Sequence, residues 1–205
     1  GIVREIGAAG AREVHENGVG VWLTPAINIH RTPLCGRNFE YYSEDPLVAG
    51  EMAAAMVEGI QSEGVGASLK HFACNNKETN RKDSDSRVSE RALREIYLKG
   101  FEICVKKAQP LTVMSSYNLL NGLWASQNRE LLTDILRGEW GFEGMVTTDW
   151  YTHAPQYTEI AAGNDVKMGC GDPAHTLKMM REGKLSREDV KTSVKRLLEM
   201  ILKLA

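Results

Sequence analysis

Short apolar runs alternate with amphipathic segments along most of this 205-residue chain. The runs are rich in strand-forming residues, whereas the segments between them place apolar residues at helical spacing. Expected strands lie at 19–26, 65–72, 111–117, 144–148 and 165–168, and expected helices at 2–16, 46–60, 91–106, 128–137 and 187–204. Apolar strands that alternate with helices predict a parallel sheet covered on both faces, and therefore an α/β fold.

Capping residues mark the starts of several expected helices. Asp45 precedes a proline at the start of the second helix, and Ser89 can cap the third. Ser186 and Asp189 resemble a capping box ahead of the last helix. These signals place helix starts independently of the apolar pattern.

Polar clusters follow nearly every expected strand, at 28–40, 70–81, 115–118 and 149–151. Barrels collect such residues at the carboxyl ends of many strands, whereas an open doubly wound sheet gathers them at one switch point. No glycine-rich dinucleotide or phosphate fingerprint lies at a strand-to-helix turn. We therefore expect a (β/α)8 TIM-type barrel, of which 205 residues would form only a part, because a complete one takes ~250.

The composition favours a neutral, small ligand. The formal net charge is -2 and charged residues make up 25% of the chain, so nothing indicates a nucleic-acid partner. No apolar run approaches the ~20 residues of a membrane span, and we expect no membrane partner. Charged residues interrupt the first 16 positions, which therefore do not read as a signal peptide. Cytoplasmic, periplasmic and secreted locations all stay open, as does the oligomeric state.

The cysteines and histidines predict neither a metal site nor a disulfide framework. The four cysteines form no CxxC pair, and free buried thiols are expected at Cys35, Cys74, Cys104 and Cys170. The histidines show no HxH or HExxH spacing. No GxSxG elbow exists, so Ser115 and Ser116 are poor candidates for a nucleophile.

Asp149 and Trp150 close an apolar strand, Gly-Met-Val-Thr-Thr-Asp-Trp, at the expected ligand face. A single carboxylate delivered there is a candidate catalytic group. The alternative is a helix N-cap or turn aspartate. Trp150 is either a wall on which a sugar ring stacks or ordinary hydrophobic packing.

Lys70 and His71 end another strand, and a strand-end lysine is costly to bury unless it meets an acidic or hydroxylated partner. Arg81 follows in a loop dense in amides, and Arg37 and Glu40 follow the first expected strand. These groups could form a solvated loop and a surface ion pair. They are also what recognition of a polyhydroxylated ligand requires.

Met114 and Tyr117 lie on the strand 111–118, where they alternate with buried neighbours. Methionine in such a position is more often part of a core than of a ligand site.

Five segments together resemble glycoside hydrolase family 3, over almost the whole chain. They are Thr-Pro-Ala-Ile-Asn-Ile-His-Arg, Gly-Arg-Asn-Phe-Glu-Tyr-Tyr-Ser-Glu-Asp-Pro, Leu-Lys-His-Phe, Val-Met-Ser-Ser-Tyr-Asn and Thr-Thr-Asp-Trp, in the family's order. The resemblance implies a retaining mechanism, in which one carboxylate forms a glycosyl-enzyme and a second carboxyl group acts as acid and then base.

The resemblance also implies roles for individual residues. Asp149 matches the nucleophile, and Glu40 matches a residue that supports the sugar contacts. Arg37, Lys70, His71, Arg81 and Tyr117 match positions that hydrogen-bond the sugar at the non-reducing end, and Met114 and Trp150 match walls of that subsite. We expect the cations around Asp149 to lower its pKa and keep it ionised.

The same resemblance narrows the branch of the family. The loop 72–87 contains no histidine, which disfavours the β-N-acetylglucosaminidase type with its Asp-His pair. In the glucosidase type the acid/base is a glutamate of a following α/β domain. We therefore expect residues 1–205 to be one partial catalytic barrel, truncated at its N-terminus and lacking that domain.

The expected activity is retaining hydrolysis of β-glucosides, or of close relatives such as xylosides, from the non-reducing end. The substrate would be a small carbohydrate such as a β-glucoside or cello-oligosaccharide, with no metal and no cofactor. Two alternatives stay open. In the first, the chain is a catalytically inert sugar-binding fragment without its acid/base domain. In the second, the chain does not fold alone, because an open barrel exposes strand edges and an apolar face.

Overall fold

Four parallel strands form the central sheet, in the order β1-β2-β4-β7. The computed structural model describes residues 1–204. The strands are β1 (Val21–Trp22), β2 (Gly66–Phe72), β4 (Thr112–Ser115) and β7 (Met145–Thr148). Isolated parallel bridges join Ala26 to Lys70 and Thr147 to Val166, so the segment around Val166 extends the sheet beyond β7.

All the strands expected from the apolar runs therefore take part in the sheet, and the predicted α/β class is confirmed. The first is shorter than predicted, because ladder pairing in the 19–26 run is limited to Val21–Trp22 and the bridge at Ala26. Within residues 1–204 the strands form an open arc with β1 at one edge.

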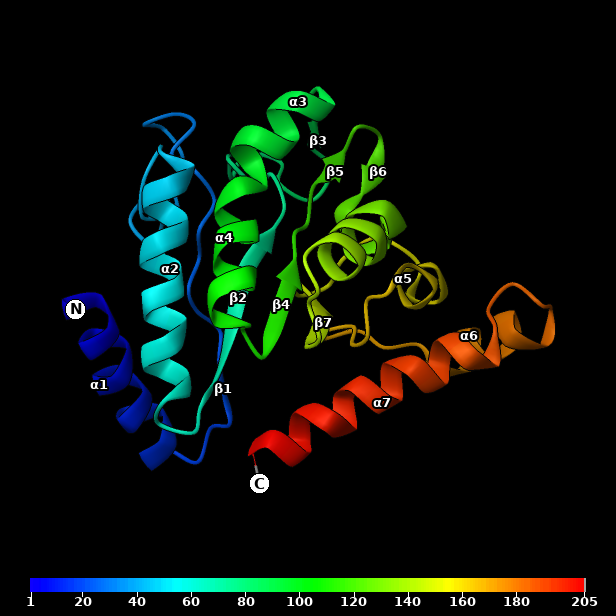
Figure 1. The fold of residues 1–205 in the computed structure, drawn as a ribbon. Helices are drawn as coiled ribbons and strands as arrows, with labels where there is room; N and C mark the ends of the chain where they lie inside the picture. Colours follow the sequence, from blue (N-terminus) through cyan, green and yellow to red (C-terminus); the bar gives the residue numbers. More distant parts are fainter. Residues whose placement is uncertain (205) are drawn as a thin grey trace.

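Helices α1 (Ile2–Glu16), α2 (Pro46–Gln61) and α4 (Lys99–Ala108) cover one face of the sheet (Figure 1). α2 packs between α1 and α4. Gly59 allows the close approach of α1 and α2, since a Cβ there would lie 2.1 Å from the Arg4 carbonyl oxygen. The apolar face of α2 is therefore buried against two neighbours.

The predicted helix 91–106 is interrupted. It comprises α3 (Glu90–Ala92), the π-helical turn η1 (Leu93–Tyr97) and α4. The predicted helix 128–137 is also π-helical, as η3 (Glu130–Glu139). The apolar spacing predicted the positions of both elements. It does not distinguish an α-helix, whose N–H groups bond to the carbonyl four residues earlier, from a π-helix, in which they bond to the carbonyl five residues earlier.

The C-terminal part contains α5 (Gln156–Ala162), α6 (Pro173–Arg181) and α7 (Arg187–Leu204). Only α7 was expected. The N-cap half of its capping box is confirmed, because the Asp189 amide donates to Ser186 Oγ at 3.0 Å, but Asp189 Oδ2 accepts from the Ser186 hydroxyl, at 2.6 Å, and not from its amide. The other expected caps are also confirmed, since Asp45 accepts from two amides of α2 and Ser89 accepts from the Ala92 amide.

A small second sheet lies beyond the carboxyl ends of β2 and β4. It consists of β3 (Asp85–Ser86), β5 (Leu119–Leu120) and β6 (Leu123–Trp124), followed by the short helix η2 (Ala125–Gln127). Asn121 and Gly122 form the turn of the β5-β6 hairpin, with φ values of 51° and 90°. This sheet was not predicted.

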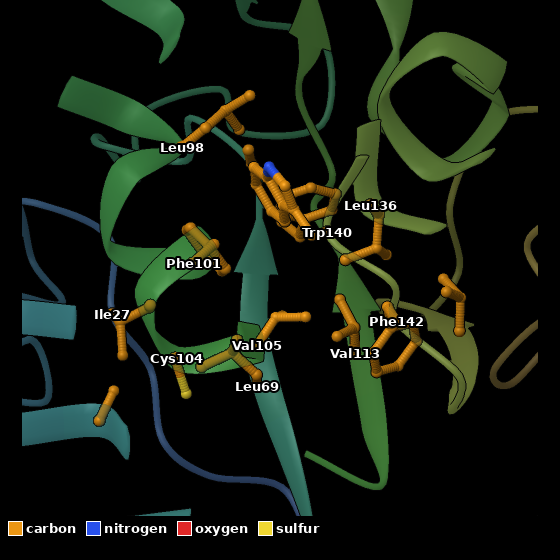
Figure 2. Close-up of a cluster of buried hydrophobic side chains, with 14 of the residues drawn as sticks. Ile27, Leu69, Leu98, Phe101, Cys104, Val105, Val113, Leu136, Trp140 and Phe142 are labelled. Carbon is orange, nitrogen blue, oxygen red and sulfur yellow. The ribbon is translucent and has the colours of Figure 1, made fainter. Parts of the chain in front are cut away.

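The main hydrophobic core lies between the sheet and its covering helices (Figure 2). The Phe72 ring lies 5.1 Å from Phe101 and 5.8 Å from Trp140, which ties β2 to α4 and to the end of η3. Leu69, Val105 and Val113 complete this layer. The core therefore fixes β2 and β4, whose carboxyl ends carry most of the candidate site.

All four cysteines are free thiols, as predicted. Cys35, Cys74 and Cys104 are buried, but the expectation of burial is wrong for Cys170, which is exposed next to α6. Within residues 1–204, no group of three or more His, Cys, Asp or Glu side chains is placed to hold a metal ion. In the same part of the chain, no helix has the length and apolar character to cross a membrane.

Candidate active site

Asp149 lies directly after β7, and only 6% of its surface is exposed. Its amide donates to the Ser115 carbonyl at 3.1 Å, which continues the pairing of β7 with β4. Oδ1 accepts from the Trp150 amide at 2.7 Å, whereas Oδ2 is buried and has no hydrogen-bond partner among residues 1–204. The N-cap alternative is wrong, because the next helix begins at Gln156 behind Pro155.

His71 faces this carboxylate from β2. Its Nε2 lies 3.8 Å from Asp149 Oδ2, which is too long for a hydrogen bond. Asn28 anchors the His71 backbone in both directions: its Nδ2 donates to the His71 carbonyl and its Oδ1 accepts from the His71 amide, each at 2.9 Å. Burial, followed by the charges of Arg37, Lys70 and Arg81, holds the pKa of His71 well below its usual value.

Glu40 joins two of the candidate cations. It pairs with the Arg37 guanidinium, and its Oε2 lies 3.6 Å from Lys70 Nζ. The three side chains are 15% to 22% exposed, so this is no surface pair, and the acidic partner expected for Lys70 is Glu40. Burial lowers the pKa of Lys70, and the charge of Glu40 opposes this shift.

Arg81 and Tyr117 meet on another side of Asp149. The Arg81 guanidinium lies 4.7 Å from the centre of the Tyr117 ring and donates to Glu78 at 2.7 Å. Burial, and after it the charge of Asp149, raise the pKa of Tyr117 to about 12. The Tyr117 phenol is therefore protonated and can donate at neutral pH.

Met114 and Trp150 differ in their burial. Met114 is 2% exposed but does not belong to the main core cluster, whereas its neighbour Val113 does. Because side chains alternate along a strand, Met114 lies on the opposite face of β4 from that core. Trp150 is 44% exposed, so it is not core packing. The exposure of Trp150 agrees with a wall of a ligand site, whereas the burial of Met114 leaves both the wall and the core alternative open.

The expected lowering of the Asp149 pKa is wrong: its pKa is raised, with burial as the largest cause. The Trp150 amide, Tyr117, Arg81 and Arg37 act in the opposite direction but do not outweigh burial. The cations are also partly neutralised by their own carboxylates, Glu40 and Glu78. The sequence indicated the Arg37–Glu40 pair, but as a surface pair, whereas the two side chains are only 18% and 22% exposed.

A buried ion pair supports the loop that follows Asp149. Lys167 Nζ donates to Glu159 Oε2 at 2.9 Å, to the Thr152 carbonyl at 3.1 Å and to the Ala154 carbonyl at 2.8 Å. Glu159 also accepts from the Thr152 hydroxyl at 2.7 Å. Sequence analysis missed this group and the role of Asn28. Of these residues, only Asn28 was indicated by a sequence pattern, the alternation Ile-Asn-Ile after the first strand.

The structure thus brings the candidate residues Arg37, Lys70, His71, Arg81, Tyr117 and Trp150 close to Asp149, with Glu40 bound to two of them. Met114 lies on β4, paired with Thr147 two residues before Asp149. The sequence profile of the glycosyl hydrolase family 3 N terminal domain matches residues 1–200. The chain belongs to glycoside hydrolase family 3. The family inferred from the five motifs is confirmed.

Similar proteins in the family share both sequence and fold with this chain. Beta-glucosidase A of Butyrivibrio fibrisolvens is 58% identical over 189 residues, which are 92% of this chain and 23% of that protein. An exo-alpha-(1->6)-L-arabinopyranosidase of Bifidobacterium breve is 45% identical over 98% of this chain and 27% of its own length. Beta-glucosidase 3B of Thermotoga neapolitana, solved in complex with alpha-D-glucose, superposes with a TM-score of 0.95 at 52% identity, over 98% of this chain and 30% of that one.

These family 3 proteins are considerably longer than the chain. The 205-residue chain spans 23% of the Butyrivibrio protein and 30% of the Thermotoga chain. The fold is therefore the α/β fold of part of the family's N-terminal domain.

Proposed function

We propose that Asp149 is the nucleophile of a retaining hydrolysis that removes β-linked glucose, or a close relative of it, from the non-reducing end of a small carbohydrate. The observation that carries this proposal is the buried carboxylate at the end of β7 with Oδ2 free of hydrogen bonds. Carboxylates serve as nucleophiles in glycosidases, and an oxygen without a protein partner can attack without first giving one up. The names of the similar beta-glucosidases and the glucose bound to the Thermotoga enzyme support the choice of sugar.

The surrounding side chains suit the hydroxyls of one sugar unit. Arg37, Lys70, His71, Arg81 and Tyr117 supply N–H and O–H groups, and Met114 and Trp150 supply apolar surface. Glu40 would hold Arg37 and Lys70 in place through the ion pairs described above. Fixed donors over a partly apolar floor are the usual composition of a sugar site.

The proposed reaction has two displacements. Asp149 Oδ2 attacks the anomeric carbon, the glycosidic C–O bond breaks, and the departing oxygen takes a proton from a second carboxyl group. Water then attacks the glycosyl-enzyme, gives its proton to that group, and releases the sugar and Asp149. We propose that residues 1–205 form part of a (β/α)8 barrel. We further propose that the second carboxyl group is a glutamate outside these residues. The share of the similar proteins that the chain spans supports this.

A fluorosugar trap tests the nucleophile. 2,4-Dinitrophenyl 2-deoxy-2-fluoro-β-D-glucoside carries a leaving group that needs no protonation, so the acid/base is not required for the first displacement. We expect one glycosyl group on the peptide that contains Asp149, found by mass spectrometry, and none in Asp149→Asn. Labelling of a different residue would overturn the assignment, as would a product of inverted configuration.

A second candidate function is weak sugar binding without turnover. The observation that favours it is that the chain spans less than a third of the similar proteins. Positioned proton transfer contributes a factor of ~10²–10⁴ to such rates. Without the acid, the rate of hydrolysis should therefore fall far more for cellobiose than for an activated aryl glucoside. Turnover of cellobiose by this chain would contradict the binding-only function, whereas hydrolysis of the aryl glucoside alone agrees with a missing acid.

A further inference from the structure

Lys82 joins two loops that leave different strands of the sheet. It lies in the loop after β2, and its Nζ donates to the Tyr151 carbonyl, 3.2 Å away, in the turn after β7. The same ammonium lies 5.2 Å from the centre of the Tyr117 ring and 5.9 Å from that of the Tyr151 ring. Cations this close to aromatic faces are attracted to them. Lys82 therefore contacts Tyr117, which lies beside Asp149, and the turn that follows Asp149.

Tyr151 needs such support because its φ is 57°, in the left-handed region that costs energy for any residue with a Cβ. Surrounding contacts must hold a residue in this conformation. The Tyr151 amide donates to the Met168 carbonyl at 3.1 Å, and the Tyr151 carbonyl accepts from Lys82. One of the two hydrogen bonds of the Tyr151 backbone therefore comes from a side chain of a distant loop.

This turn determines how Asp149 presents its two oxygens. The Trp150 amide, one residue before Tyr151, donates to Asp149 Oδ1 at 2.7 Å, which leaves Oδ2 as the free oxygen. The Trp150 amide belongs to the 149–150 peptide and the Tyr151 carbonyl to the 151–152 peptide. A loss of the Lys82 contact would therefore reach Oδ1 through the backbone torsions of Tyr151 and Trp150. Lys82 thus acts on Asp149 by two routes, through the turn to the Trp150 amide and through the Tyr117 ring.

We propose that Lys82 is a positioning residue for Asp149: the ammonium bound to the Tyr151 carbonyl and to both tyrosine rings fixes the turn that sets which carboxylate oxygen faces the sugar. This inference rests on the proposed function of Asp149. It assigns Lys82 no contact with substrate and no proton transfer.

Other contacts hold the same two loops together, so the loss of Lys82 should not unfold them. Asp83 Oδ1 lies 3.0 Å from His153 Nδ1, and Trp124 Nε1 donates to the Lys82 carbonyl at 3.2 Å. The Lys82 main chain therefore stays anchored when its side chain is replaced. This makes Lys82→Met a specific test of the ammonium.

The experiment compares the wild-type chain with Lys82→Met, Lys82→Arg and Lys77→Met, which removes an exposed cation from the same loop. Dinitrophenolate release from 2,4-dinitrophenyl 2-deoxy-2-fluoro-β-D-glucoside is followed over a range of concentrations to separate the maximal labelling rate from the half-saturating concentration. We expect Lys82→Met to lower the maximal rate at least about tenfold, because small misplacements of a reacting group cost about that much or more. The half-saturating concentration of Lys82→Met should stay within about twofold of the wild-type value. Lys82→Arg should recover most of the rate, and Lys77→Met should equal wild type.

Amide hydrogen exchange at Tyr151 and Thr152 gives an independent reading. Exchange should accelerate in Lys82→Met and return toward wild type in Lys82→Arg. An unchanged labelling rate in Lys82→Met would overturn the positioning role, and so would a change confined to half-saturation, which would make Lys82 a sugar contact. If the wild-type chain is not labelled at all, the nucleophile proposal fails, and hydrogen exchange alone tests Lys82. Faster exchange in Lys82→Met would then support the role of Lys82 in holding the turn, and unchanged exchange would overturn that role.

Discussion

His71 Nε2 lies 3.8 Å from Asp149 Oδ2, with the two side chains only 2% and 8% exposed. The two groups do not form an ion pair, because burial lowers the pKa of His71 and raises the pKa of Asp149. Each shift favours the neutral form of its group. At the centre of the site, His71 Nε2 and Asp149 Oδ2 therefore face each other without a hydrogen bond between them, and a hydroxyl of a bound sugar could bond to Oδ2.

The first prediction concerns acid stability. His71 has a lowered pKa when folded, so below its unfolded value of about 6.5 the unfolded chain binds the extra proton and stability falls with falling pH. His71→Gln should remove this part of the slope, which amounts to at most about 1.4 kcal/mol per pH unit. Urea unfolding between pH 5 and pH 7 measures it. His15→Gln, at an exposed helical position, is the control and should keep the wild-type slope.

The second prediction is that Asp149→Asn stabilises the chain at neutral pH. The raised folded pKa means that ionised Asp149 costs stability above its unfolded pKa of about 3.9, and the cost grows as the pH rises through the folded value. Removal of the charge and of the unpartnered acceptor should gain about 1 kcal/mol at pH 7. The gain should disappear below pH 4. Thermal unfolding of Asp149→Asn and of the exposed control Asp134→Asn measures both effects, and a destabilised Asp149→Asn would contradict the assigned pKa direction.

Local patterns predicted the sheet and the position of Asp149 because both depend on short stretches of sequence. The run Gly144 to Thr148 is apolar and the next residue is a carboxylate, so strand, strand end and candidate group could be read together. The small sheet was missed although Asn121-Gly122 is a strong hairpin signal. Its strands are only two residues long, too short for an alternating pattern to register.

The energetics of the site could not be predicted in the same way. The pKa of Asp149 depends on how deeply the folded chain buries it and on which carboxylates neutralise Arg37 and Arg81. The contact of Lys82 with Tyr151 joins positions 69 residues apart. The pairs Arg37–Glu40 and Arg81–Glu78 are three residues apart and could be read from spacing. The burial of Asp149 and the contact of Lys82 could not, since both arise only when distant segments lie side by side.

The third prediction concerns Asp165, whose side chain is fully buried between two arginines. Oδ2 accepts from Arg137 at 2.9 Å and Oδ1 from Arg196 of α7 at 3.0 Å. Asp165→Asn leaves two poorly exposed guanidinium groups without their counter-ion, which should cost about 3 kcal/mol. Urea unfolding measures the loss. Glu199→Gln breaks an exposed pair with Lys195 on the same helix and should change stability by less than about 0.5 kcal/mol.

The fourth prediction uses two helical glycines in opposite surroundings. Gly59 of α2 faces α1 so closely that a Cβ would lie 2.1 Å from the Arg4 carbonyl oxygen, and backbone cannot yield as a flexible side chain can. Gly59→Ala should therefore push the helices apart and cost about 2 kcal/mol or more. Gly138 of η3 has room, because the nearest atom to its Cβ would be the Thr133 oxygen at 3.6 Å. Gly138→Ala should gain up to about 1 kcal/mol from the better helix propensity of alanine. Thermal unfolding of both variants measures the contrast, and equal effects at the two sites would show that α1 and α2 do not meet through Gly59.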